Sequence, residues 1–452
     1  MATRRVVISG LGPISGLGAG IESTWSRLNS GDSAVGPIRV FDPAGFGCQV
    51  AAEVEGFEIR NHVPKSYRKA TKVMARDIEL AVGAADLAAR DAGLVTHGRV
   101  QETSVSPTYP SSRMGVHVGA GLISAQLDEL TAALAEATDE HGRFDYHKWG
   151  REGITHLTPL WLLKYLPNML ACHVTIIHDA QGPSNTITCG EASATLSIGE
   201  SFRVIQRGAA DLCFCGGAES KLNLMTYLRQ EMTGRLNTED NDNPARSVRP
   251  FCQTAAGTVV GEGGGIVILE AVETYGQRAP ASPDGGTRPY AEVLGFGASQ
   301  TVNPDGGNLE PDAQGRGIAV AIRAAMRDAG VEPGQIDLII PFGSGVPSYD
   351  QAEAAALAGV FGDHLVRTPV ASVKAAAGTC GAGVGGLDVC VAAAAVAYQT
   401  VPAIINCDRP RAGLNAGSAP ARACPLNHVL VYSTGLGGQN AALVLGRWKG
   451  QA

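Results

Sequence analysis

The sequence predicts a layered α/β protein, for three reasons. Short runs of β-branched and apolar residues alternate with stretches at helical spacing along the chain, which is the pattern of a largely parallel sheet covered by helices. Glycine accounts for 58 of the 452 residues and charged residues for only 17%, a composition that favours a compact core with close backbone approaches over disorder. No short-period repeat is visible, so solenoids and propellers are disfavoured.

The expected strands are short runs of mostly apolar residues bounded by turn-forming residues. In chain order they span residues 5–9, 114–118, 185–188, 210–215, 265–269, 336–341, 429–433 and 441–445. Residues 275–290, rich in proline, glycine and serine, are the best candidate for a connection between two halves. We therefore expect an N-terminal half over residues 1–275 and a C-terminal half over residues 290–452.

Charge and cysteine usage narrow the function classes. The formal net charge of −7 gives no reason to expect a nucleic-acid partner. The N-terminus lacks the apolar core of a signal peptide, and we expect no apolar run of transmembrane length and no membrane partner. The ten cysteines are scattered without metal-ligand spacing, which favours free thiols in a reducing cytoplasm and no metal site.

A glycine pair after the first expected strand invites a cofactor interpretation. Gly10 and Gly12 begin like a dinucleotide-binding fingerprint, but Ser15 occupies the position of its third glycine. We therefore expect no nucleotide cofactor.

The most informative passage runs from Gly182 to Glu200. A short β-branched strand ends at Thr188, Gly190 permits a sharp turn, and apolar residues then recur at helical spacing. The side chain of Glu191 is expected in the first turn of a buried helix, where free N–H groups and the helix dipole favour negative charge. Strand-turn-helix elbows of this kind often hold a nucleophile.

This passage resembles the active-site segment of the β-ketoacyl-acyl-carrier-protein synthases, in which Gly-Pro-Ser-Asn-Thr-Ile leads to a catalytic cysteine followed by Ala-Ser-Gly. Here Gly182–Ile187 and Ala192-Ser193 align without a gap, which puts Glu191 at the cysteine position. The resemblance covers nearly the whole chain. It implies a thiolase-like five-layered αβαβα fold made of two duplicated halves, a dimer, and an acyltransferase site built from a cysteine and two histidines.

Both histidine positions implied by the resemblance are also changed. The family segment Ala-His-Gly-Thr-Ser-Thr-Pro matches Pro341–Pro347, with Phe342 in place of histidine. The family pattern Lys-x-x-x-Gly-His begins here at Lys374 and ends on Thr379 instead of histidine. Lys374 and Glu353 are retained as possible scaffold ions.

Two further segments separate the chain from catalytic members of that family. The gate, Gly-Phe-Gly-Gly in the family, is Gly435–Gly438 here, so Thr434 and Leu436 mark a gate without its aromatic residue. Residues 345–362 resemble the corresponding segment of the chain-length factors of type II polyketide systems, which also lack the cysteine and this histidine. Glutamate at position 191, where those proteins commonly carry glutamine, is a departure from them.

The expected function follows from these replacements, because acyl transfer needs a nucleophile and imidazoles that stabilise the developing charge. We expect a non-catalytic, chain-length-factor-like homologue in polyketide or fatty-acid biosynthesis that pairs with an active ketosynthase, or with itself, and shapes the acyl tunnel. The alternative is an unusual homodimeric acyltransferase or malonyl-carrier-protein decarboxylase that uses Glu191. A third possibility is a stand-alone acyl-carrier or lipid-binding pseudoenzyme.

Glu191 needs a charged partner if it is buried, because an unpaired buried charge is costly. We hypothesise that it pairs with Lys374 and plugs the ancestral cavity; alternatively it is only a favourable charge at a helix start. Cys189 and Cys380 flank the changed positions, and we expect core thiols at both rather than replacement nucleophiles.

A basic stretch stands out in the otherwise acidic chain, within an expected helix from Lys65 to Arg76. Similar residues of the resembling family bind the acidic acyl carrier protein, which makes that protein an expected partner. A solvated helix face is the alternative. The docking candidates are Lys65, Arg68, Lys69 and Lys72.

Overall fold

The computed structural model describes residues 3–98, 105–278, 288–302 and 310–450. One hydrogen-bonded path runs through the large sheet in the order β10-β13-β14-β9-β1-β8-β7-β5-β6, with β2 (Gly18–Ala19) paired to β1. The N-terminal half supplies β1 (Val6–Ser15), β5 (Met114–Gly119), β6 (Ser184–Ile187), β7 (Leu212–Ser220) and β8 (Glu262–Ala271). The C-terminal half supplies β9 (Ala291–Gln300), β10 (Leu338–Ile340), β13 (His428–Thr434) and β14 (Gln439–Gly446).

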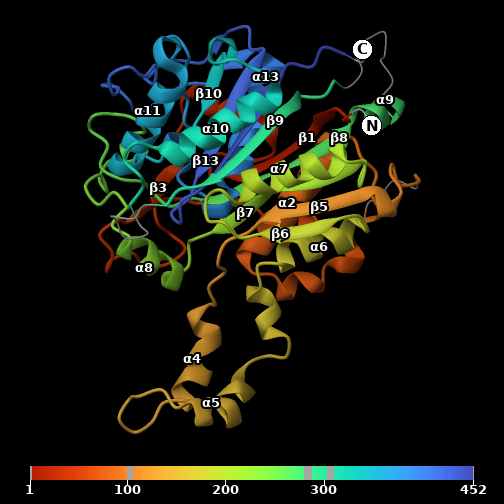
Figure 1. The fold of residues 1–452 in the computed structure, drawn as a ribbon. Helices are drawn as coiled ribbons and strands as arrows, with labels where there is room; N and C mark the ends of the chain where they lie inside the picture. The colour runs from red at the N-terminus through yellow and green to blue at the C-terminus, as the bar shows by residue number, and fades with distance from the viewer. Residues whose placement is uncertain (1–2, 99–104, 279–287, 303–309, 451–452) are drawn as a thin grey trace.

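Two buried helices lie between the strands of the two halves and form the central layer (Figure 1). α7 (Ser193–Gln206) packs on β5 and β7, α13 (Val384–Tyr398) packs on β8 and β13, and the two helices contact each other. α2 (Arg76–Asp91) and α6 (Met169–His178) cover the outer side of the N-terminal strands. α10 (Arg316–Ala329), flanked by α11 (Pro347–Phe361), covers β9 and β14. The chain thus has the expected helix-sheet-helix-sheet-helix layers.

Smaller elements complete the described chain. They are α1 (Ile21–Ser30), α4 (Leu127–Glu136), α5 (Tyr146–Arg151), α8 (Leu224–Met232), α9 (Val272–Arg278), α12 (Lys374–Ala377), and the two-stranded sheets β3 (Val35–Pro37) with β4 (Val50–Ala52) and β11 (Thr400–Val401) with β12 (Arg422–Ala423). Of the expected connection at residues 275–290, α9 covers the beginning and residues 279–287 lie outside the described part.

The sheet is mixed rather than largely parallel, which corrects the prediction from the sequence. β5 pairs in parallel with β6 and β7, and β10 with β13, but β8 returns antiparallel between β1 and β7. The turn from β13 to β14 is too short for a helical crossover, so these two strands also pair antiparallel.

β9 was missed from the sequence because Gly295 and Gly297 interrupt its apolar pattern. These glycines let α10 approach the strand closely: a Cβ at Gly297 would lie 2.3 Å from the carbonyl oxygen of Ala321. The two glycines therefore interrupt the apolar pattern of the strand and at the same time allow α10 to pack against it.

One helix changes an expectation about membrane-length segments. Gly381–Tyr398 is long and apolar enough to cross a bilayer, although the sequence analysis expected no such run, and 89% of it is buried inside the protein. Burial between the two sets of strands is the position of a core helix.

The expected helix from Lys65 to Arg76 does not form. Instead, short 3₁₀ turns span Lys65–Tyr67 and Ala70–Val73, and α2 begins only at Arg76. Met74 adopts an extended conformation with φ −102° and its side chain is buried, so packing against the core breaks the helical path.

Candidate functional site

The elbow forms at the expected place with a small shift. β6 ends at Ile187, Gly190 has φ 55°, and α7 begins at Ser193 after its N-cap Ala192. Ser193 Oγ donates to the Gly190 carbonyl oxygen at 2.6 Å and accepts from the Cys189 N–H at 2.8 Å, which closes the turn. Glu191 therefore lies just before the helix N-cap, not within its first turn.

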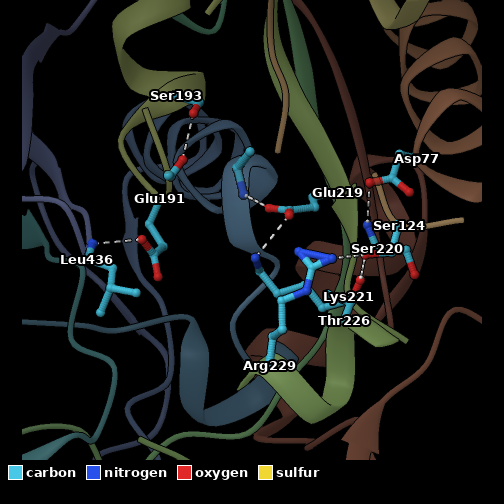
Figure 2. A network of polar contacts seen from close by, with 12 residues as sticks. Asp77, Ser124, Glu191, Ser193, Glu219, Ser220, Lys221, Thr226, Arg229 and Leu436 are labelled. Carbon is cyan, nitrogen blue, oxygen red and sulfur yellow. Dashed lines mark hydrogen bonds and ion pairs between the residues drawn. The ribbon is translucent and has the colours of Figure 1, made fainter. Parts of the chain in front are cut away.

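Glu191 is buried, with 6% of its surface exposed, and its carboxylate is fully engaged. Oε1 accepts from both terminal nitrogens of Arg235 at 3.0 Å, and Oε2 accepts from the backbone N–H of Leu436 at 3.0 Å. Figure 2 shows the carboxylate turned toward Leu436. Burial alone would raise the pKa of Glu191, but the charges of Arg235 and Lys221 and the Leu436 N–H outweigh it and lower that pKa. The group is a carboxylate at neutral pH.

Arg235, the counter-ion of Glu191, comes from the turn after α8 and is itself buried. Its guanidinium carbon lies 4.8 Å from the ring centroid of Tyr349, so the cation is held between a carboxylate and an aromatic face. Nothing in the sequence singled out this arginine.

The hypothesised pair between Glu191 and Lys374 is wrong. Lys374 Nζ forms an ion pair with Asp388 of α13 and donates to the Pro341 carbonyl oxygen at 3.0 Å. Both members of this pair are almost completely buried, so each already has the partner that burial requires. The alternative, a charge held only by the helix start, also fails, because Arg235 supplies the counter-charge.

The two positions that align with family histidines carry no titratable group. Phe342 is completely buried. The centroid of its ring lies 6.4 Å from the centroid of the Tyr349 ring and 5.6 Å from Lys374 Nζ. The hydroxyl of Thr379 hydrogen-bonds the hydroxyl of Thr258 at 2.7 Å. Within the described residues, Arg235 and Leu436 are the hydrogen-bond partners of the Glu191 side chain, so no imidazole hydrogen-bonds it.

The carboxyl group of Glu353 binds a backbone N–H group. Both of its carboxylate oxygens accept from the Gly343 N–H at 3.0 Å, and burial raises the pKa of Glu353 to about 8. The neighbouring Asp350 accepts from Gly345 N–H at 3.1 Å and from Phe251 N–H at 2.6 Å. These carboxyl groups fix the loop that carries Phe342. The raised pKa of Glu353 does not fit the scaffold ion expected at this position.

Residues 435–438, expected to form a gate, contact the elbow. Through its backbone N–H, Leu436 ties the segment to Glu191. The same segment borders a cavity of about 190 Å³ whose lining includes Ile318, Tyr349, Thr434 and Leu436. One oxygen of the Glu191 carboxylate thus holds the backbone of this segment.

A second buried charge cluster adjoins the elbow (Figure 2) and was not predicted. Lys221 donates to Glu219 Oε1 at 2.9 Å, and Glu219 Oε2 accepts from the Ala382 N–H at 2.5 Å. Asp77 accepts from the Ser220 N–H at 3.2 Å, and burial together with the nearby Glu219 charge raises the pKa of Asp77 to about 8. Glu219 and Lys221 lie at the end of β7, and Asp77 lies in the first turn of α2.

The remaining candidates differ in their exposure to solvent. The four docking candidates Lys65, Arg68, Lys69 and Lys72 are exposed, whereas Arg76 turns inward and pairs with Glu262 at 2.9 Å. Cys380 is a core thiol as expected, with a pKa raised to about 12 by burial, whereas Cys189 is partly exposed and so is not the core thiol that the sequence predicted. In the described part of the chain, no cluster of three histidine, cysteine or acidic side chains is placed to hold a metal ion.

Comparison with known proteins identifies the relatives of this arrangement. The model of the β-ketoacyl synthase N-terminal domain matches residues 3–274, and that of the C-terminal domain matches residues 290–408. The chain is 31% identical to 3-oxoacyl-[acyl-carrier-protein] synthase 2 of Coxiella burnetii and 29% identical to that of a Synechocystis strain, each over 99% of both chains.

Solved structures agree over the whole chain. The ishigamide ketosynthase/chain length factor structure is 28% identical with a TM-score of 0.80, over 99% of this chain and 100% of that one. A β-ketoacyl synthase from Burkholderia phymatum is 25% identical with a TM-score of 0.82 over the same shares.

Proposed function

This chain belongs to the β-ketoacyl synthase family and has its thiolase-like fold, and we propose that it acts as a non-catalytic, chain-length-factor-like subunit. In this role it has a β-ketoacyl synthase-like place in fatty-acid or polyketide biosynthesis, where it pairs with an active ketosynthase and helps to shape the tunnel for the growing acyl chain.

The buried ion pair at the elbow carries this proposal. Condensation needs a nucleophile that accepts an acyl group and gives it up again. The Glu191 carboxylate is held by Arg235 and by the Leu436 N–H, and its lowered pKa makes it a weak base and a weak nucleophile. An acyl group on Glu191 would also be a mixed anhydride and would leave the Arg235 charge buried without its partner.

The rest of the site supports the same conclusion. The oxygen of a reacting thioester gains negative charge, which enzymes stabilise with donors aimed at it. Phe342 offers no donor, and the hydroxyl of Thr379 is occupied by Thr258. The structure therefore supports a shape-determining role for these residues rather than a chemical one.

The edge of the large sheet offers a surface for pairing. β6 ends the sheet and, among the described strands, pairs only with β5. The side chains of Ser184 and Asn185 on this strand are exposed. An edge strand presents free N–H and carbonyl groups to a second chain, so we propose β6 as a contact with the ketosynthase.

We also propose acyl carrier protein as a partner, with docking at the exposed Lys65, Arg68, Lys69 and Lys72. Opposite charges speed the encounter of an acidic partner with such a patch. Replacing Arg68 and Lys69 by glutamate should weaken carrier-protein binding, and unchanged affinity would remove this site. A cytoplasmic location completes the proposal and is supported by the free cysteines of the described structure.

Reconstitution tests the function. The purified chain alone should release no carbon dioxide from malonyl-carrier protein, whereas co-expression with a ketosynthase from the same biosynthetic system should give a stable complex whose product length differs from that of the ketosynthase alone. Glu191→Gln, which keeps size and hydrogen-bonding capacity, is the matched control. Decarboxylation by the chain alone that Glu191→Gln abolishes would establish the enzymatic alternative instead.

A further inference from the structure

A second cavity lies where the two halves of the chain meet. Its volume is about 370 Å³, and its wall combines residues from β1, α2, α9 and α13 with residues that precede β9 and follow β14. Sites for small molecules typically have volumes of about 300–1,000 Å³. We name it the junction cavity, because both halves line it.

The junction cavity and the elbow lie at opposite ends of the same strands. Where β14 begins, beside residues 435–438, Gln439 pairs with Gln300; where β14 ends, Gly446 pairs with Glu292. Eight residues of strand separate these two ends by about 25 Å. In Figure 1, α9 marks the end that holds the junction cavity, and α8 lies at the other end. The cavity is therefore separate from the site at Glu191.

Aromatic side chains from four places in the chain form much of its wall. The whole sequence has ten tyrosines and four tryptophans, and Tyr275, Tyr290, Tyr398 and Trp448 line this one cavity. Tyr290 packs edge-on against Tyr398 with ring centroids 6.4 Å apart, and Trp448 packs on the cluster that contains Tyr275. Such rings offer flat apolar faces, which favour a planar ligand.

The polar groups with spare hydrogen-bonding capacity are donors. Arg288 and Arg447 line the cavity and are exposed, and among the described residues neither guanidinium has an ion pair or a hydrogen bond. Asp91, the acid in the described lining, is already engaged. Its Oδ1 accepts from the Tyr290 hydroxyl at 3.0 Å, and its Oδ2 accepts from the Leu11 N–H at 2.7 Å. The arginines therefore lack acceptors, whereas the carboxylate already has its donors.

Two helix ends at the cavity are also satisfied. α2 and α13 both end there, and the carbonyl groups at a helix C-terminus favour positive charge. The Ala92 carbonyl oxygen accepts from Arg278 Nη1 at 3.1 Å, and the Val396 carbonyl oxygen accepts from Gln399 Nε2 at 2.7 Å. These bonds occupy the acceptors that a cationic ligand would use, so the open donors favour an anion.

We propose that the junction cavity binds a small organic acid with a planar aromatic or conjugated body. The body packs against the tyrosine and tryptophan rings, and its carboxylate accepts hydrogen bonds from Arg288 and Arg447. Arginine is suited to this role because its planar fork matches the two oxygens of a carboxylate. The inference goes beyond the proposed function, since neither the elbow nor chain pairing takes part in it.

Calorimetry with the wild-type chain tests the ligand class. Cinnamate is the probe, and cinnamamide and cinnamylammonium present a similar body with no charge or with a positive charge. Cinnamate should bind in the millimolar range or tighter, and at least about tenfold more tightly than either analogue or inorganic phosphate. No binding of cinnamate, or affinity for any of the other three that equals its own, would overturn the inference.

Variants of the arginines test the position of the acid group. Arg288→Met and Arg447→Met should each weaken cinnamate binding by at least about tenfold. Neither substitution removes an internal ion pair among the described residues, so both variants should fold. Arg327→Met is the matched control, because Arg327 is an exposed arginine of α10 that does not line the cavity. It should leave the affinity within about twofold; equal losses in all three variants would contradict the site.

Fluorine NMR of the chain labelled with fluorotryptophan locates the ligand without relying on affinity. Cinnamate should shift the signal of Trp448, assigned from Trp448→Phe, and leave the signals of Trp149 on α5 and of Trp161 unchanged. A Trp448 signal that does not move at saturating cinnamate would overturn the inference. Either result leaves the proposed function standing, because that function depends on the elbow and on a partner chain.

Discussion

Replacing Arg235 by methionine should destabilise the protein more than replacing Glu191 and Arg235 together. Methionine keeps much of the length and apolar contact of the arginine but removes its charge. The Glu191 carboxylate, 6% exposed, would then keep the Leu436 N–H and the more distant charge of Lys221. Removing one partner of a buried ion pair typically costs about 3–5 kcal/mol, because the other charge stays buried and unpaired.

The reciprocal substitution, at Glu191, is the second single variant of a double-mutant cycle. Glu191→Leu leaves the Arg235 guanidinium buried against Tyr349 without a carboxylate, so we expect a loss of similar size. The double variant buries no charge at this position. Its cost reduces to the unpaired Leu436 N–H, about 1–3 kcal/mol, which is less than either single loss.

Urea unfolding of the four proteins at pH 7, followed by tryptophan fluorescence, measures the free energies of the cycle. The pH dependence of these free energies tests whether Glu191 is charged in the folded protein. Because the pKa of Glu191 is lowered in the folded protein from 4.5, its stabilising contribution is present above that value and is lost as the pH falls below it. The difference between wild type and Arg235→Met should therefore shrink toward pH 4. Single losses below about 1 kcal/mol, or losses that simply add, would refute the reasoning.

Three further predictions concern groups around the site. The pKa of Asp77 is raised to about 8, so this side chain holds a proton in the folded protein that the unfolded chain releases near pH 3.8. The free energy of unfolding should therefore fall as the pH rises from 5 to 7.5. In urea titrations Asp77→Asn should reduce this slope by about 1 kcal/mol per pH unit, and an unchanged slope would contradict the raised pKa of Asp77. Gly297→Ala should cost about 1–3 kcal/mol because its Cβ meets the backbone of α10. Gly36→Ala, which has open space, should leave the melting temperature unchanged, and equal effects would argue against the close packing of β9. Iodoacetamide at pH 7.5 should modify the partly exposed Cys189 and spare the buried Cys380 until denaturant is added, as read by peptide mass mapping; the reverse order would contradict the burial of Cys380.

The sequence predicts most of the strands because their patterns are local. Residues 429–433 and 441–445, for example, lie within the observed β13 and β14. β9 was missed because the glycines that α10 requires break its pattern. α4 and α5 were missed because most of their residues are exposed, so their apolar side chains form no stripe against a core.

The site was predictable only in part. The alignment of Gly182–Ile187 placed Glu191 at the elbow, because strand, turn and helix follow one another in the chain. Its partner could not be found in this way. Arg235 is 44 residues away, and its approach to Glu191 depends on the folding of the turn after α8 rather than on any local signal. From the alignment alone, Lys374 was the expected partner of Glu191, but Lys374 forms its ion pair with Asp388 of α13.

The proposal that this chain transfers no acyl group is tested most directly by intact-mass spectrometry. The purified chain is incubated with an acyl-carrier-protein thioester at pH 7, with an active ketosynthase treated in parallel as the positive control. The chain should keep its unmodified mass while the ketosynthase gains one acyl group. A stoichiometric acyl adduct on this chain that disappears in Glu191→Gln would contradict the account.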